Sequence, residues 1–221
     1  MTGPVPAVLF DLDGTLVRSE HVHRRAWQRF FDTWRLDVDE ETYARDYLGR
    51  RAVDVLAHVR GPWRPADVPG ALAALDAHAH DGAGDVAVVP GAVELLRDLH
   101  GRGHRLAVVT SAGRAWADRV LDGVLCVGDA VGVRVTAEDV AVGKPSPEGY
   151  RRACRLLGVD PAGCAAVEDS PPGVRALVAA GVGTVVGVTT TSPAAALRAA
   201  GAGATVPDLR PPASLAALQL A

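Results

Sequence analysis

Asp11 and Asp13 are the residues of this sequence whose type and spacing most clearly suggest chemistry. They follow directly on the apolar run 5–10, which predicts a buried strand because turn residues bound it. Residues two apart in an extended segment share one face, so both carboxylates can address one bound group. Carboxylates this close repel each other, and a divalent cation relieves the repulsion. A plain Asp-Gly turn is the alternative, whereas the further acids of an EF-hand loop are missing.

Hydroxyl and amide groups follow a second predicted strand, at 105–110. Thr110, Ser111 and Ala112 offer hydroxyls and backbone N–H groups just before the next predicted helix. The start of a helix favours anions, so this segment is a candidate anion site. Simple capping of the helix is the alternative.

A second acid pair, Glu168 and Asp169, follows the predicted strand 164–168. In open α/β sheets, ligands bind beyond the carboxyl ends of the strands, where this pair lies. The pair could also cap the helix that begins after it.

Lys144 is the only lysine in the sequence, and the other 22 basic residues are arginine. An ammonium is a compact charge that fits beside a phosphoryl oxygen, whereas a guanidinium is a wide planar fork. We therefore interpret Lys144 as a candidate phosphate-binding residue, with a solvated loop lysine as the alternative.

These residues need a scaffold, and the alternation of apolar strands with helices after residue 85 predicts one. Further strands are predicted at 133–136 and 184–188, and helices at 91–100, 115–122, 148–157, 173–180 and in the alanine-rich segment 194–204. Such alternation predicts an α/β fold with a Rossmann-like parallel sheet covered on both faces.

The segment 17–85 differs, because it shows helical patterns and no convincing strand. Its aromatic residues Trp27, Phe30, Phe31 and Trp34 follow the spacing of one helix face, and further helical stretches are predicted at 40–48, 50–60 and 66–80. We expect an all-helical cap domain over 17–85, inserted into an α/β core formed by 1–16 and 86–221.

Composition narrows the function classes. The 221 residues are 48% hydrophobic and 22% charged, which is ordinary for a globular protein. A net charge of −3 argues against a nucleic-acid partner, and the apolar runs are too short for a membrane span. We expect a cytoplasmic protein whose three cysteines are buried thiols.

In order and content, the four polar segments resemble the motifs of the haloacid dehalogenase superfamily, specifically its phosphatases with an inserted helical cap. The stretches 109–111, 135–140 and 167–174 look closest to phosphatases of small sugar and polyol phosphates and to the β-phosphoglucomutase-like subgroup. The resemblance implies a phosphoric monoester hydrolase with Mg²⁺ as cofactor.

The same resemblance implies roles for individual residues. Asp11 would be the nucleophile that forms an aspartyl-phosphate, and Asp13 the general acid and base. Mg²⁺ would be held by the carboxylates of Asp11 and Asp169 and the backbone carbonyl of Asp13, with Glu168 acting through bound water. Thr110, the amides near Ser111 and Ala112, and Lys144 would stabilise charge on the phosphoryl oxygens.

In the cap, His23, Arg50 and Arg51 are the candidate substrate-binding residues. His23 could instead be a packed hinge residue, and the two arginines a solvated helix face. Arg18 departs from the aspartate that relatives often carry. Caps of this kind close over small molecules, so we expect a small phosphorylated metabolite as the partner and a monomer or weak dimer.

Other functions fit less well. Phosphosugar mutases usually carry a lysine just after the second motif, where this chain has Ser111-Ala112-Gly113-Arg114 and no second lysine exists. Receiver domains have their acid pair on the first strand and their phosphorylated aspartate on a later one, which is the opposite order. A catalytically dead binding protein is disfavoured because every motif residue is present.

Overall fold

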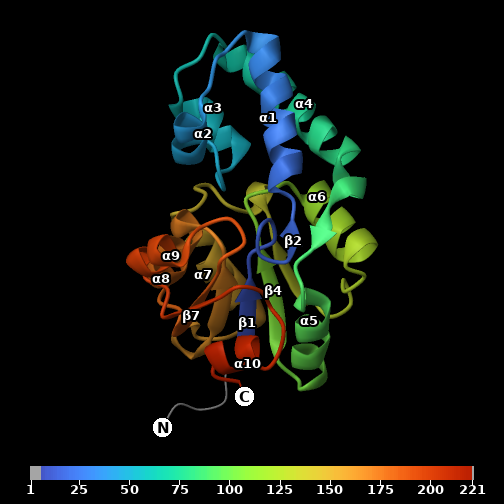
Figure 1. Ribbon diagram of the computed structural model, residues 1–221, viewed down its shortest axis with the longest axis vertical. Helices are drawn as coiled ribbons and strands as arrows, with labels where there is room; N and C mark the ends of the chain where they lie inside the picture. Colours follow the sequence, from blue (N-terminus) through green and yellow to red (C-terminus); the bar gives the residue numbers. More distant parts are fainter. Residues whose placement is uncertain (1–5, 221) are drawn as a thin grey trace.

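The computed structural model of the protein describes residues 6–220, and their centre is a six-stranded parallel sheet (Figure 1). The strand order is β5-β4-β1-β6-β7-β8. The strands are β1 (Ala7–Phe10), β4 (Arg105–Val109), β5 (Val133–Val135), β6 (Ala165–Glu168), β7 (Thr184–Val188) and β8 (Ala204–Val206). This order confirms the predicted α/β core.

Four residues of the apolar run before Asp11, those of β1, form a central strand, and all four are buried, as in a strand covered on both faces of its sheet. Phe10 lies opposite Val108 of β4 on one side and Val167 of β6 on the other. This register brings the carboxyl ends of the three strands to one edge.

Helices cover both faces of the sheet. They are α5 (Ala92–Gly101), α6 (Arg114–Asp118) with a π-helical turn (Arg119–Val124), α7 (Glu148–Leu157), α8 (Pro171–Ala180), α9 (Ala194–Ala200) and α10 (Ala213–Ala217). One buried cluster joins α5, α6 and α10 to the sheet, and a second joins α7, α8 and α9 to its other face. Short 3₁₀ turns occupy Pro65–Asp67, Ala83–Asp85, Ala137–Asp139 and Pro161–Gly163.

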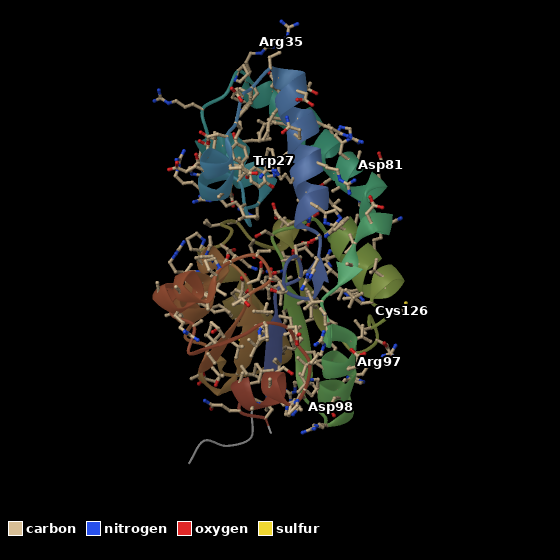
Figure 2. All side chains as sticks on the ribbon, viewed as in Figure 1. Trp27, Arg35, Asp81, Arg97, Asp98 and Cys126 are labelled. Atoms are coloured by element: carbon tan, nitrogen blue, oxygen red, sulfur yellow. The ribbon has the colours of Figure 1, made fainter. Side chains whose placement is uncertain are left out.

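Four helices form a separate body beside the carboxyl edge of the sheet: α1 (Glu20–Trp34), α2 (Glu40–Asp46), α3 (Ala52–His58) and α4 (Val68–Asp81). Trp27, Phe30 and Phe31 are buried in a third hydrophobic cluster, while Trp34 is half-buried beside it. Figure 2 shows Trp27 among these helices and Arg35 at the far end of α1. The predicted aromatic helix face is therefore confirmed, and the helices form a cap over the core.

Some elements differ from expectation. The segment 17–85 contains a strand, β2 (Val17–Arg18), which pairs antiparallel with β3 (Ala87–Val88). Two residues are too few to show a strand period in the sequence. The alanine-rich helix ends at Ala200, because Gly201 takes a left-handed conformation (φ 115°) and leads into β8. The boundaries at 16/17 and 85/86 remain a prediction.

The cysteine prediction was wrong for one residue. Cys154 and Cys164 are buried, but Cys126 is exposed at the edge of the molecule (Figure 2). Cys126 lies in a turn with φ 52°, after the π-helical segment, rather than in a core-facing helix or strand.

None of the helices within residues 6–220 combines the length and apolar character that a membrane span requires.

Candidate active site

The predicted polar residues meet at the carboxyl edge of the sheet. The amide of Asp11 donates to the carbonyl of Val167 on β6, and that of Thr110 to Val135 on β5. Asp169 directly follows β6. The sheet therefore fixes the backbone of the first, second and fourth motifs, whereas Lys144 lies on the loop between β5 and α7.

Three buried carboxylates, those of Asp11, Glu168 and Asp169, place oxygen atoms within 4.8 Å of one another. The Asp169 carboxylate accepts hydrogen bonds from the hydroxyls of Thr15, at 3.0 Å, and Thr191. Burial, with the charges of Glu168 and Asp11, raises the pKa of Asp169 well above its usual value. Ionising all three acids would therefore leave more negative charge than the surrounding protein groups neutralise.

Lys144 is the one cation inside this group among the described residues. Its Nζ lies 2.5 Å from Oδ1 of Asp11 and 2.7 Å from Oε1 of Glu168. Burial raises the pKa of Asp11 to about 7, although Lys144 acts in the opposite direction. The lone lysine of the sequence is therefore a buried partner of the candidate nucleophile and not a solvated loop residue.

Glu168 is fully buried and held by several donors. Its Oε2 accepts from the amide and hydroxyl of Ser170, at 2.7 and 2.9 Å, and its Oε1 accepts from Lys144 and Tyr150. With both oxygens engaged, Glu168 orients Lys144 and adds negative charge, which fits an indirect role toward a metal.

The donor set fits a magnesium ion. Three carboxylates face one ammonium, so a divalent cation would balance the remaining charge, and Mg²⁺ prefers oxygen ligands. The carboxylates of Asp11 and Asp169 would be its ligands. The carboxylate of Asp13 lies outside this group, and the part expected of its backbone carbonyl stays a prediction.

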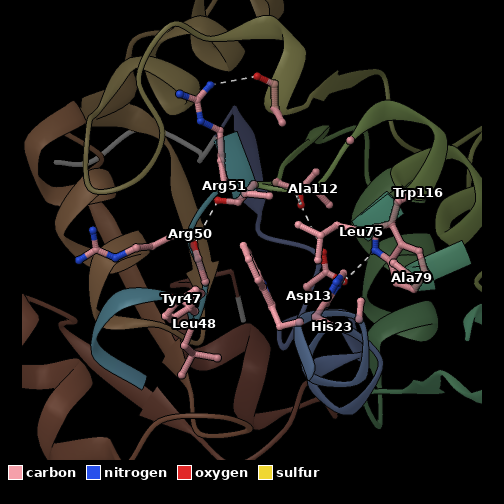
Figure 3. Close-up of a pocket in the computed structure, with 18 of the residues that line it drawn as sticks. Asp13, His23, Tyr47, Leu48, Arg50, Arg51, Leu75, Ala79, Ala112 and Trp116 are labelled. Carbon is pink, nitrogen blue, oxygen red and sulfur yellow. Dashed lines mark hydrogen bonds and ion pairs between the residues drawn. The ribbon is translucent and has the colours of Figure 1, made fainter. Parts of the chain in front are cut away.

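Asp13 points toward the cap instead. Its Oδ1 accepts three hydrogen bonds: from Ser19 Oγ at 2.5 Å, Trp116 Nε1 at 2.9 Å and His23 Nε2 at 3.0 Å. Figure 3 shows His23 and Trp116 converging on Asp13. Burial acts to raise the pKa of Asp13, but the His23 charge and these hydrogen bonds hold it below the usual value. Burial acts to lower the pKa of His23, but the charge of Asp13 and its hydrogen bond, together with the charges of Glu20 and Asp11, raise it above the usual value.

The segment after β4 has a different arrangement from the one expected. Oγ1 of Thr110 accepts the Ala112 amide at 3.0 Å and lies 3.4 Å from Oδ2 of Asp13. Ser111 donates its hydroxyl to the carbonyl of Gly49 in the cap, at 3.2 Å. The Ala112 amide already has a partner, and Ser111 joins the cap to the core. Substrate binding by Ser111 and Ala112 stays a prediction.

Arg50 and Arg51 diverge. Arg50 is exposed at the rim, and its side chain points away from the cavity centre in Figure 3. Arg51 is buried and directs its nitrogen atoms at Asp54 and at three carbonyls of the core. All three nitrogen atoms of the Arg51 guanidinium thus donate to protein oxygens. The expected contact with substrate stays a prediction for both arginines.

A cavity of about 360 Å³ lies between the cap and the carboxyl edge of the sheet. Its floor includes Asp11, Asp13 and Lys144, and cap helices supply much of its remaining wall (Figure 3). Ligand pockets span about 300–1,000 Å³, so this cavity suits a small molecule.

Four further residues support the site, and the sequence patterns did not indicate them. Ser19 and Trp116 complete the donors around Asp13, Thr191 bonds Asp169, and Tyr150 contacts Glu168. Ser19 could have been suspected from its place just after the first motif. The other three come from distant helices and loops and carry no local signal.

A family model described as haloacid dehalogenase-like hydrolase matches residues 5–181. The chain belongs to this family.

Relatives with named activities agree with this membership. The chain is 40% identical over 190 residues to validoxylamine A 7'-phosphate phosphatase of Streptomyces hygroscopicus subsp. limoneus, covering 86% of this chain and 88% of that one. It is 37% identical to hexitol phosphatase A of Escherichia coli K12, covering 78% of each. Beta-phosphoglucomutase of Mycobacterium tuberculosis is 32% identical, covering 93% of this chain and 90% of that one.

The structure of CbbY from Rhodobacter sphaeroides in complex with phosphate superimposes with a TM-score of 0.81 and 28% identity. The match covers 98% of this chain and 100% of the CbbY chain. With the named phosphatase relatives, these findings make the protein a phosphatase-type enzyme of the haloacid dehalogenase-like family.

Proposed function

We propose that the protein hydrolyses a small phosphomonoester through an aspartyl-phosphate on Asp11, with Mg²⁺ as cofactor. The observation that carries the proposal is the buried group of Asp11, Glu168 and Asp169 around a single ammonium, at the floor of the cavity beneath the cap. A carboxylate next to a cation and a metal-binding acid is suited to attack phosphorus.

In the first step an oxygen of Asp11 forms a bond to phosphorus while the ester P–O bond breaks. Asp13 in its protonated form gives a proton to the departing alkoxide through Oδ2, because its Oδ1 is held by Ser19, His23 and Trp116, and the second step restores this proton. In the second step Asp13 takes a proton from water, which attacks phosphorus and releases Asp11 and inorganic phosphate.

Neither Lys144 nor Thr110 forms or breaks a covalent bond in either step. The ammonium beside Asp11 reduces the negative charge that an incoming phosphoryl group meets, and the Thr110 hydroxyl lies close to Asp13. Mg²⁺ bound by Asp11 and Asp169 would supply positive charge to the phosphoryl oxygens.

The charges around the cavity favour a neutral, hydroxyl-rich leaving group. Lys144, His23 and Arg51 already face carboxylates. The cap also contributes the acids Glu20 and Asp76 to the lining of the cavity. Carboxylates accept hydrogen bonds from hydroxyls and repel a second anionic group. Sugar and polyol phosphates have this character, as the names of two relatives also suggest.

A phosphosugar mutase is the second candidate, supported by a relative of that name. At the position of the lysine that mutases usually carry, Arg114 pairs with Asp139 and is not among the residues that line the cavity. This placement favours hydrolysis.

The test is phosphate release from a panel of hexose, hexitol and glycerol phosphates, phosphoglycolate, nucleotides and β-glucose 1-phosphate. Each assay is run with magnesium, with chelator and with Asp11→Asn. Magnesium-dependent release that the variant abolishes is the expected result. Conversion of β-glucose 1-phosphate to the 6-phosphate without release would assign a mutase instead.

A further inference from the structure

Arg51 lies in the cap, just before α3, yet most of the hydrogen bonds of its side chain reach the core. Its Nη1 donates to the carbonyls of Ala137, at 3.0 Å, and Val140, at 2.6 Å, and its Nη2 donates to that of Ala141 at 2.8 Å. Only 4% of the residue is exposed. One buried guanidinium therefore spans the boundary between cap and core.

Asp54 completes this contact from the first turn of α3. Its carboxylate accepts from Nε and Nη2 of Arg51, at 2.7 and 2.5 Å, and from the amide of Gly143 at 3.3 Å. A Cβ on Gly143 would lie 2.6 Å from Asp54 and 2.7 Å from Arg51. The pair is thus packed directly against the residue that precedes Lys144.

The same core segment, residues 137–143, is also held from within the core. The carboxylate of Glu148 accepts from the amides of Ala141 and Val142, at 2.9 Å each. Glu148 fixes the amides of the segment and Arg51 its carbonyls. The hydrogen bonds from Glu148 lie within the core. Those from Arg51 exist only while the cap is closed on the core.

We propose that Arg51, oriented by Asp54, is a positioning residue that couples the seating of the cap to the placement of Lys144. Arg51 fixes the segment whose last residue, Gly143, adjoins Lys144. When the cap lifts, three carbonyls lose their buried charged donor, and the segment gains freedom just where the ammonium must meet Asp11.

The proposal rests on the proposed function, because it takes Lys144 as part of the phosphoryl-transfer site. It assigns Arg51 no contact with substrate. The two roles predict different kinetics. A substrate ligand that is lost raises KM, whereas a lost positioning contact lowers the fraction of enzyme with Lys144 in place and therefore lowers kcat.

The experiment compares the full chain with Arg51→Ala, Arg51→Lys and the matched control Arg45→Ala. Arg45 is an exposed cap arginine whose contacts, Thr42 and Asp46, lie within the cap. We expect Arg51→Ala to lower kcat about tenfold with a much smaller change in KM, as for a typical coupling between sites. Arg51→Lys keeps the charge and should fall between Ala and wild type, while Arg45→Ala should match wild type.

Hydrogen exchange supplies a readout that does not need turnover. Amides in 137–144 should exchange faster in Arg51→Ala than in wild type or Arg45→Ala, since local opening becomes easier. Unchanged kcat, a rise in KM alone, or unchanged exchange would each overturn the proposal. Absent phosphate release in the wild type would instead refute the proposed function, and exchange would still test the coupling.

Gly143→Ala is the second variant, used if Arg51→Ala does not fold. It keeps every charged side chain and places one methyl group of the core against Arg51 and Asp54 of the cap, which forces them apart. The same loss of kcat and faster exchange are expected, and wild-type values of both would contradict the coupling.

Discussion

Nε2 of His23 lies 3.0 Å from Oδ1 of Asp13, so the first cap helix reaches the carboxylate that we assign to proton transfer. Ser19 and Trp116 donate to the same oxygen. With Oδ1 saturated by donors, Oδ2 remains the oxygen that can exchange a proton with a bound substrate. In this geometry His23 orients Asp13, and the substrate-binding role expected for it stays a prediction.

His23→Ala should therefore lower kcat, because the carboxylate loses one of its three orienting donors and the nearby positive charge. We expect a drop of about 10- to 100-fold, below the full contribution of a general acid. Steady-state phosphate release measures it. His21→Ala is the control, since His21 is solvent-facing and its side chain contacts the carbonyl of Asp85, away from Asp13. Equal kcat in the two variants would rule out the orienting role.

Asp11→Asn and Asp13→Asn should both abolish most turnover. The first removes the nucleophile, and the second removes the acid and base, which is worth about 10²- to 10⁴-fold. Phosphate release under saturating substrate is the measurement, with circular dichroism to verify folding. A folded variant of either kind with near wild-type turnover would show the assigned mechanism to be wrong.

The stability of the metal-free protein should fall as pH rises through about 7. Burial raises the pKa of Asp11 from 3.8 to about 7, and it raises that of Asp169 as well. The folded state then binds more protons than the unfolded state between these values, so rising pH favours unfolding. Magnesium binds the ionised acids, and its stabilising effect should grow over the same range.

Thermal unfolding from about pH 5 to about pH 8, with magnesium and with chelator, measures both trends. A magnesium-induced shift in Tm that is the same across the range would contradict the predicted competition between protons and metal. Asp169→Asn is the control, because it removes one of the two acids and should flatten both trends.

Gly173→Ala should destabilise the protein although it lies in a helix. A Cβ there would come within 1.5 Å of Oε1 of the buried Glu168, and such overpacking costs about 1–3 kcal/mol. Gly70→Ala makes the same change in the cap helix α4, where a Cβ would meet no atom within 4 Å apart from its chain neighbours and the backbone of its own helix, and should stabilise by up to about 1 kcal/mol. Urea unfolding compares the two, and equal effects would exclude a constraint from Glu168.

The main features of the core could be predicted because they are local. The run before Asp11 and the run before Glu168 are short, apolar and bounded by polar residues, which defines buried strands. Parallel strands then carry their carboxyl-end residues to one edge, as observed for Asp11, Thr110 and Asp169. The composition alone singles out Lys144, because it is the only lysine in the sequence.

What could not be predicted depends on packing between distant segments. Trp116 was one aromatic residue among several, and its hydrogen bond to Asp13 exists only because α6 packs beside α1 and α4. The place of Arg51 after Gly49 in the cap predicts contact with substrate but gives no sign of its contacts with the core. Its carbonyl partners are 86 to 90 residues away and show no pattern that a sequence could reveal.

Since Lys144 is the sole lysine and its side chain is only 7% exposed, amine-reactive reagents find no accessible lysine on the folded enzyme. Acylation of that side chain can occur only when the ion pairs with Asp11 and Glu168 open. The rate of lysine modification therefore reports how often this site opens. Mass spectrometry can follow it at Lys144 alone, with no reporter residue introduced into the chain.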